Sequence, residues 1–346
     1  MINHNTDPTS KLFESSSSFL FANDTSSILS QPTLGKHRPD QNAIFSFASG
    51  VYDDLAMFIL SARKSGFKGD IVINIPKRTQ LEEKVMKFLD IQSKHGVVVY
   101  EGYDISLIEG EYKFILDRND VAFEVARFEY FYIWSHHYPD KEIMIIDGEY
   151  SYFQTNPFAA PTDCGQMALN FYEENYHTIN FDFMYIDHKD IWKTILGIFQ
   201  IDDDGEMVFR QEISCNSVLN PSSIVGHQHA LKRFLFNLID LFDASECTYY
   251  GCDYACVNYL FYKEIQKIGN PISFSVSSRQ QGGHFINTGF AASLHYLSQN
   301  KIYDLNSNLF LNSDGQPTPV VLNYHLYKEV EWLFDKRLED LLKEIE

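Results

Sequence analysis

The chain has 346 residues, of which 45% are hydrophobic and 15% aromatic, enough apolar material for one large domain or two smaller ones. It carries 28 Lys and Arg against 47 Asp and Glu, a net charge of -19. A surface this acidic repels phosphate backbones and anionic lipid, which excludes nucleic-acid and membrane-surface binding as general functions.

Residues 1–41 are rich in Ser, Thr, Asn and Asp, a composition that predicts a flexible polar arm. This segment has no secretory signal pattern, and no apolar run in the chain approaches the roughly 20 residues that span a bilayer. We therefore expect no membrane span and a cytoplasmic location, with a missing upstream anchor as the alternative. Residues 42–346 contain no Pro/Gly-rich linker and predict a single domain.

The cysteines do not suggest a disulfide framework, because their number is odd and no signal peptide accompanies them. Three of them are close enough in sequence to suggest zinc, but their spacing lacks the paired arrangement of zinc sites. We expect buried or unpaired thiols. The cysteines are Cys164, Cys215, Cys247, Cys252 and Cys256.

The first predicted elements form a β-α-β unit. Residues 43–48 are a short apolar run typical of a buried strand, and Ser49-Gly50 follows as a tight loop. Apolar residues at helical spacing predict a helix over 53–65, and residues 71–75 predict a second buried strand. The unit has the length of a strand–helix–strand crossover.

The alternation then continues, with helices expected over 80–89 and 120–138 and strands over 96–100 and 142–146. This order predicts an α/β fold whose central sheet is mixed and mostly parallel, with helices on both faces. Ligands of such sheets bind at the carboxyl ends of the strands. Ser49-Gly50 and Asp147, which directly follow strands, are therefore placed where a ligand would bind.

The second half of the chain is less regular. We expect strands over 181–186, 198–201 and 207–213, with the acidic run 202–205 as a turn, and helices over 229–242, 254–268 and 327–345. His227 and His229 flank a helix start, where capping or solvent exposure is a commoner role than metal binding.

The stretch 142–158 resembles a known family. It reads EIMIIDGEYSYFQTNPF, so an apolar strand leads to Asp147, Glu149 follows, and the stretch closes on Phe-Gln-Thr-Asn-Pro-Phe. This resembles the metal-binding strand end of a group of GT-A glycosyltransferase-like proteins. In that group the strand runs into Asp-x-Arg-Asp, then an aromatic residue, Gln, an acidic residue or Asn, and Pro-Phe.

Other stretches resemble the same family in their order and spacing. They are the opening unit at 43–75, Arg127 with its neighbours at 128–130, and the segments 213–217, 251–254, 258–260 and 319–325. Together they cover about residues 43–336, and their shared order carries the resemblance. It implies a GT-A (Rossmann-like) fold and sugar transfer from a nucleotide-diphosphate donor.

The resemblance also implies a divalent metal, since a cation stabilises a departing diphosphate. Asp147 matches the first carboxylate of the family. Glu149-Tyr150 stands where the family has Arg-Asp, and Glu149 is the substitute because residues two apart in an extended strand face the same side. Asn323 occupies the histidine position of the family, and His325 lies two residues further. The predicted ligands of Mn²⁺ or Mg²⁺ are Asp147, Glu149 and His325.

The remaining candidates concern the donor and the acceptor. Donor binding is predicted for the loop 46–50, through Ser46, Ser49 and Gly50. Arg127 either approaches a donor phosphate or forms an ion pair in the core. Asp253 is the candidate catalytic residue, orienting the acceptor or assisting proton removal, and a helix N-cap is its alternative role.

Two functions follow from these residues. The first is a glycosyltransferase that moves a sugar from a nucleotide-diphosphate donor to a hydroxyl acceptor with the help of a metal ion. In the second, the altered metal site has decayed and the fold persists as a catalytically silent module that binds a glycan or a protein partner. No Gly-x-Ser-x-Gly elbow, Walker-type loop or His-Glu-x-x-His pattern indicates another enzyme class.

Overall fold

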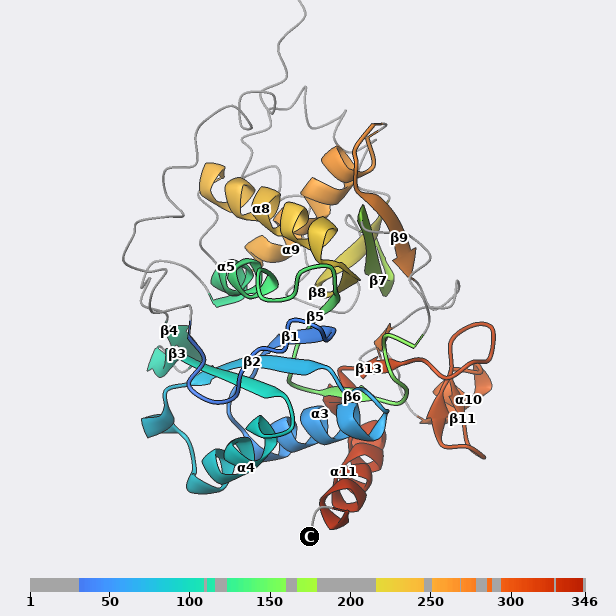
Figure 1. Cartoon of the computed structure of the whole chain (residues 1–346). Helices are drawn as coiled ribbons and strands as arrows, with labels where there is room; N and C mark the ends of the chain where they lie inside the picture. Colours follow the sequence, from blue (N-terminus) through green and yellow to red (C-terminus); the bar gives the residue numbers. More distant parts are fainter. Residues whose placement is uncertain are drawn as a thin grey trace, which may run out of the picture.

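The computed structural model describes residues 31–108, 111–115, 123–159, 167–178, 216–245, 251–267, 269–277, 285–287, 294–326 and 328–344. Its centre is an eight-stranded sheet in the order β4-β3-β2-β1-β5-β8-β7-β9, with helices on both faces (Figure 1). The predicted α/β architecture with a mixed sheet is therefore confirmed. The strands are β1 (Ala43–Phe47), β2 (Asp70–Pro76), β3 (Val97–Ile108), β4 (Glu111–Ile115), β5 (Glu142–Ile146), β7 (Ala168–Thr178), β8 (Ser217–His227) and β9 (Ser273–Ser277).

The middle of the sheet is parallel. β3, β2, β1 and β5 pair in the same direction, while β8 runs antiparallel to both β5 and β7, and β4 antiparallel to β3. From β1 the chain adds β2 and β3 on one side and then returns to add β5 on the other side of β1. The carboxyl ends of β1 and β5 therefore flank a topological switch point, where α/β sheets bind ligands.

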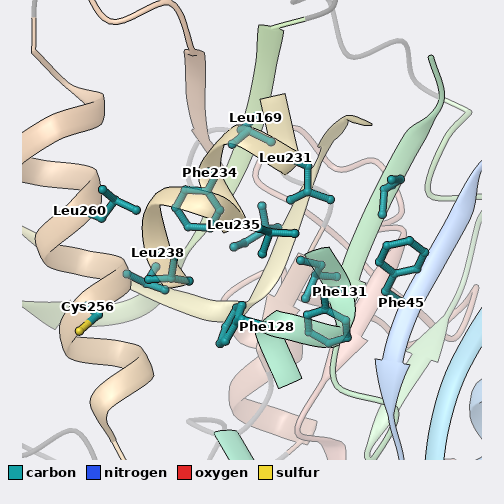
Figure 2. Close-up of a cluster of buried hydrophobic side chains, with 14 of the residues drawn as sticks. Phe45, Phe128, Phe131, Leu169, Leu231, Phe234, Leu235, Leu238, Cys256 and Leu260 are labelled. Atoms are coloured by element: carbon teal, nitrogen blue, oxygen red, sulfur yellow. The ribbon is translucent and has the colours of Figure 1, made fainter. Parts of the chain in front are cut away.

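One face of the sheet is covered by α5 (Phe123–Ser135), α8 (Gln228–Ala244) and α9 (Cys252–Leu260). α8 places apolar residues three and four positions apart, so a single side of it is buried against the sheet. Figure 2 shows the resulting core, in which side chains of the three helices meet those of β1 and β7. The labelled residues are Phe45, Phe128, Phe131, Leu169, Leu231, Phe234, Leu235, Leu238, Cys256 and Leu260.

The opposite face is covered by α3 (Tyr52–Lys64), α4 (Glu83–Ser93) and α11 (Lys328–Lys343). A small sheet joins them, formed by β6 (Ser151–Phe153), β13 (Val320–Leu322) and β10 (Phe285–Asn287). β6 is the continuation of the chain after β5, and it pairs antiparallel with β13. This pairing brings the C-terminal part of the chain back to the end of β5. The short elements α10 (Leu294–Gln299), β11 (Tyr303–Asp304) and β12 (Leu309–Phe310) complete this side.

Most predicted elements of the first half lie within a few residues of the observed ones. α4 begins at Glu83 instead of residue 80, because residues 78–80 form a separate 3-10 turn. The strands predicted between 181 and 213 lie outside the described residues. Within the described part of the chain, no helix is long and apolar enough to cross a membrane.

The N-terminal arm predicted over residues 1–41 does not extend to its predicted end. Leu34 forms a β-bridge with Val99, and Arg38 makes an ion pair with the buried Asp70 at 2.6 Å. Residues 31–41 are thus packed against the sheet, and residues 1–30 lie outside the described part.

Two of the cysteines, Cys252 and Cys256, are buried in α9. Cys252 is disulfide-bonded, which corrects the prediction of a thiol at this position. Burial raises the pKa of the Cys256 thiol to about 12, so this residue is a poor metal ligand at neutral pH. The other three cysteines lie outside the described residues.

Candidate functional site

Arg127 joins the end of β5 to the first turn of α9. Its Nη1 donates to Asp147 Oδ1 at 2.6 Å, and its Nη2 donates to Asp253 Oδ2 at 2.9 Å. The side chains of Arg127 and Asp253 are only 7% and 3% exposed, whereas that of Asp147 is 55% exposed. Arg127 Nε also donates to the carbonyl oxygen of Glu124. Three contacts therefore fix the guanidinium, and one of its carboxylate partners faces solvent.

Asp147 stands on a rigid support. The four residues before it, Ile143 to Ile146, are buried in the centre of the sheet, and Ser151 Oγ donates to the Asp147 carbonyl oxygen at 2.6 Å. At Gly148 a Cβ atom would lie 2.7 Å from Ser46 Oγ and 2.9 Å from the Phe47 carbonyl oxygen, so glycine is required. The strand end and the loop after β1 are in direct contact.

Glu149 also joins the end of β5 to the loop after β1. Its Oε1 accepts a 2.8 Å hydrogen bond from the Ser49 backbone N–H. Burial raises the pKa of the Glu149 carboxyl, and the charge of Asp147 raises it further. Glu149 thus faces the loop after β1 and lies near a second carboxylate.

The donor loop predicted over 46–50 is only partly available to a ligand. Ser46 is fully buried, and its hydroxyl donates to the Ile146 carbonyl oxygen at 2.7 Å. It therefore supports the loop without reaching the surface. Ser49 and Gly50 are half-buried, and Gly50 has a positive φ of 82° that a glycine adopts without strain.

His325 approaches the site from the C-terminal side. It lies on the 3-10 turn Tyr324–Leu326 after β13, and its ring stacks on Tyr150 with 3.5 Å between centroids. Its Nδ1 is buried without a hydrogen-bond partner, and burial lowers the pKa of the ring to about 4. The fold brings His325 next to the residue that follows Glu149, but the ring packs on an aromatic side chain.

Two acidic residues near the site were not among the sequence candidates. Burial raises the pKa of Asp54, in the first turn of α3, to about 6, and the charge of Glu149 adds to this effect. Burial likewise raises the pKa of Glu124, one turn before Arg127. The sequence signal for Asp54 is its position in the first helical turn after the loop that follows β1.

The metal set predicted from the sequence is only partly assembled. Across the part of the chain that the structure describes, no three His, Cys, Asp or Glu side chains converge as a ready-made metal site. Asp147 and Glu149 remain as two neighbouring carboxylates whose charges repel each other. This donor set fits Mg²⁺ or Mn²⁺, since Mg²⁺ at nucleotide sites is bound through one or two carboxylates plus phosphates and water.

When the chain is compared with known proteins, the matches are all to solved structures. No protein-family model and no curated protein matches the sequence. The galactosyltransferase LgtC, in complex with donor and acceptor sugar analogues, is 12% identical with a TM-score of 0.44, over 87% of this chain and 94% of that chain. The bifunctional glycosyltransferase WbbM, in its apo form, is 10% identical with a TM-score of 0.45, over 90% of this chain and 52% of that one.

Proposed function

We propose that this chain transfers a sugar from a nucleotide-diphosphate donor to a hydroxyl acceptor at the carboxyl ends of β1 and β5. The observation that carries the proposal is the half-exposed carboxylate of Asp147, held by the buried Arg127 at the topological switch point of the sheet. A nucleotide in an α/β sheet of this kind binds at such a point. The order of the motifs along the sequence supports the same function.

Asp147 and Glu149 are the residues that would hold Mn²⁺ or Mg²⁺. When bound, such an ion supplies Lewis-acid stabilisation for a leaving diphosphate. The whole chain is strongly acidic, with a net charge of -19, so a donor needs local positive charge to bind. His325 contributes to this site by packing against Tyr150, which follows Glu149.

Arg127 and Asp253 have complementary roles in the proposed site. The guanidinium of Arg127 fixes the orientation of Asp147 and places positive charge beside it. Asp253 holds the other end of the guanidinium, and burial raises the pKa of its carboxyl to about 6. Because the Asp253 side chain is only 3% exposed, we assign it to orienting the site through Arg127 instead of removing a proton from the acceptor.

Ser49 and Gly50 are the proposed donor contacts of the loop after β1. The Ser49 N–H is already bonded to Glu149, so the position of this loop depends on the same carboxylate that is proposed to bind the metal. Binding of a cation by Glu149 would compete for that hydrogen bond. Metal binding and loop position are therefore coupled in the proposed mechanism.

A second candidate is a catalytically silent module that binds a glycan or a protein partner. It is favoured by the fact that Asp147 and Glu149 both have protein partners, Arg127 and the Ser49 N–H. In this alternative the two carboxylates stabilise the fold and hold no ion. The two candidates differ in whether a donor is consumed.

The test supplies the protein with individual nucleotide sugars, Mn²⁺ and a panel of hydroxyl acceptors, and follows release of the nucleoside diphosphate. The proposal predicts that one donor is consumed and that Asp147→Asn slows its consumption by about 100-fold or more, the scale of losing a charge-stabilising group. If the folded wild-type protein consumes no donor with any acceptor, the silent module replaces the transferase.

A further inference from the structure

A pocket lies at the amino ends of the parallel strands, at the edge of the sheet opposite the candidate site. Its volume is about 340 Å³. It lies where the chain enters β1, β2 and β5, one strand length from Asp147. Most of the pocket surface is polar. The lining residues are Asp40, Gln41, Asn42, Gly66, Phe67, Lys68, Gly69, Lys141, Asn156 and Phe158.

Two arginines hold the carbonyl groups of the loop between α3 and β2. Arg63 Nη1 donates to the carbonyl oxygens of Phe67 and Gly69 at 3.1 and 2.8 Å, and Arg38 Nη2 donates to that of Lys68 at 2.9 Å. The peptide bonds here are trans, so each N–H points away from the carbonyl of its own peptide unit. The N–H groups of Lys68 and Gly69 are therefore directed away from the arginines.

These two N–H groups are available donors. Neither the Lys68 nor the Gly69 N–H donates a hydrogen bond to any described residue. The guanidinium groups on the carbonyl side polarise the same peptide units, which makes their N–H groups stronger donors. Gly69 packs directly against the backbone of Asn42, since a Cβ at Gly69 would lie 2.2 Å from the Asn42 carbonyl oxygen.

The charges around the pocket favour an anion. The ammonium groups of Lys68 and Lys141 form no ion pair with any described residue, and both residues line the pocket. Asp40 is the single carboxylate among the lining residues, and its Oδ2 accepts a hydrogen bond from Gln41 Nε2 at 3.0 Å. Two cations against one carboxylate make a local excess of positive charge on a chain whose net charge is -19.

We propose that this pocket binds a phosphate group, free or as the monoester of a small molecule. The Lys68 and Gly69 N–H groups would donate to its oxygens, and the ammonium groups of Lys68 and Lys141 would neutralise its charge. Backbone N–H groups combined with lysines are a common way for proteins to bind phosphate. The inference concerns the opposite edge of the sheet and holds whether or not the chain is a glycosyltransferase.

Amide NMR spectra of the deuterated, ¹⁵N-labelled full chain test the proposal. Inorganic phosphate is added at constant ionic strength, with chloride as the reference salt. We expect saturable shifts of the Lys68 and Gly69 amide signals, and affinity lower by about tenfold or more in Lys68→Ala/Lys141→Ala. The control Lys87→Ala/Lys94→Ala removes the same charge from two exposed positions, one in α4 and one directly after it, and keeps the wild-type affinity.

A parallel titration with a sugar monophosphate distinguishes the two sources of the group. Tighter binding of the ester than of inorganic phosphate identifies a phosphorylated metabolite as the ligand, and equal binding identifies free phosphate. The proposal is overturned if phosphate causes no saturable shift at the two amides. It is equally overturned if the Lys68→Ala/Lys141→Ala variant binds phosphate as tightly as the wild type.

Discussion

The guanidinium of Arg127 donates a 2.6 Å hydrogen bond to the carboxylate of Asp147, joining the long aromatic helix α5 to the end of β5. The same guanidinium also neutralises the buried Asp253. One cation thus serves two carboxylates, and Glu149 adds a third beside Asp147. This excess of negative charge at a strand end is the physical reason to expect a second cation there.

Replacing Arg127 by Met tests the structural part of this arrangement. The change leaves the Asp253 carboxylate buried without its partner, so the free energy of unfolding falls by about 3–5 kcal/mol. Urea denaturation measures this value. The double variant Arg127→Met/Asp253→Asn removes both charges and recovers a large part of the loss. A double variant no more stable than the single one would show that the ion pair is not the source of the effect.

The stability of the protein depends on pH through its buried acids. Burial raises the pKa of Asp54 from 3.8 to about 6, so between these values the folded chain binds more protons than the unfolded chain. The contribution of this group to stability is fully present below about pH 4 and is lost as the pH rises through about 6. The variant Asp54→Asn carries no charge, so it gains stability relative to the wild type over this range.

Urea titrations of Asp54→Asn and the wild type between about pH 4 and pH 7 measure that difference. The neighbouring Asp53 is exposed, and Asp53→Asn is the matched control for removing one charge from the same helical turn. If the difference in the free energy of unfolding between Asp54→Asn and the wild type stays constant with pH, the shifted pKa of Asp54 is contradicted.

A substitution at His325 tests whether this residue packs on Tyr150 or binds the metal ion. Phe at this position keeps the stack on Tyr150, and no hydrogen bond of Nδ1 is lost because this atom has no partner. We expect His325→Phe to bind a donor with Mn²⁺ within about twofold of the wild-type affinity, since the two carboxylates carry the ion. Calorimetry measures that affinity. A loss of about tenfold or more would identify His325 as a ligand of the metal.

The regular part of the fold is predictable from the sequence, because its strands are continuous apolar runs and its helices have one apolar side. β8 was not predicted, since its sequence SVLNPSSIVGH contains a proline and several polar residues. Its place in the sheet depends on β5 and β7, far away in the sequence. Local patterns do not encode such pairings.

The candidate site shows the same division. Asp147 can be named from its position directly after an apolar strand, whereas Arg127 and Asp253 are named only through the resemblance of their motifs to the GT-A family. The contacts between these residues could not be predicted, since Arg127 and Asp253 are separated by 126 positions in the sequence. The role of Asp253 as a helix N-cap is excluded, because Gly251 occupies that position. His227 is the capping histidine expected from the sequence, since its Nδ1 accepts from the His229 N–H.

Calorimetric titration of nucleotide sugars into the protein, with and without Mn²⁺, tests the proposed donor site most directly. The control is Asp140→Asn, an exposed carboxylate before β5 at a positive φ of 61° that Asn tolerates. We predict that one donor binds only when Mn²⁺ is present, that Asp147→Asn abolishes this binding, and that Asp140→Asn preserves it. Donor binding that is independent of Mn²⁺ and unchanged in Asp147→Asn would contradict the proposed site.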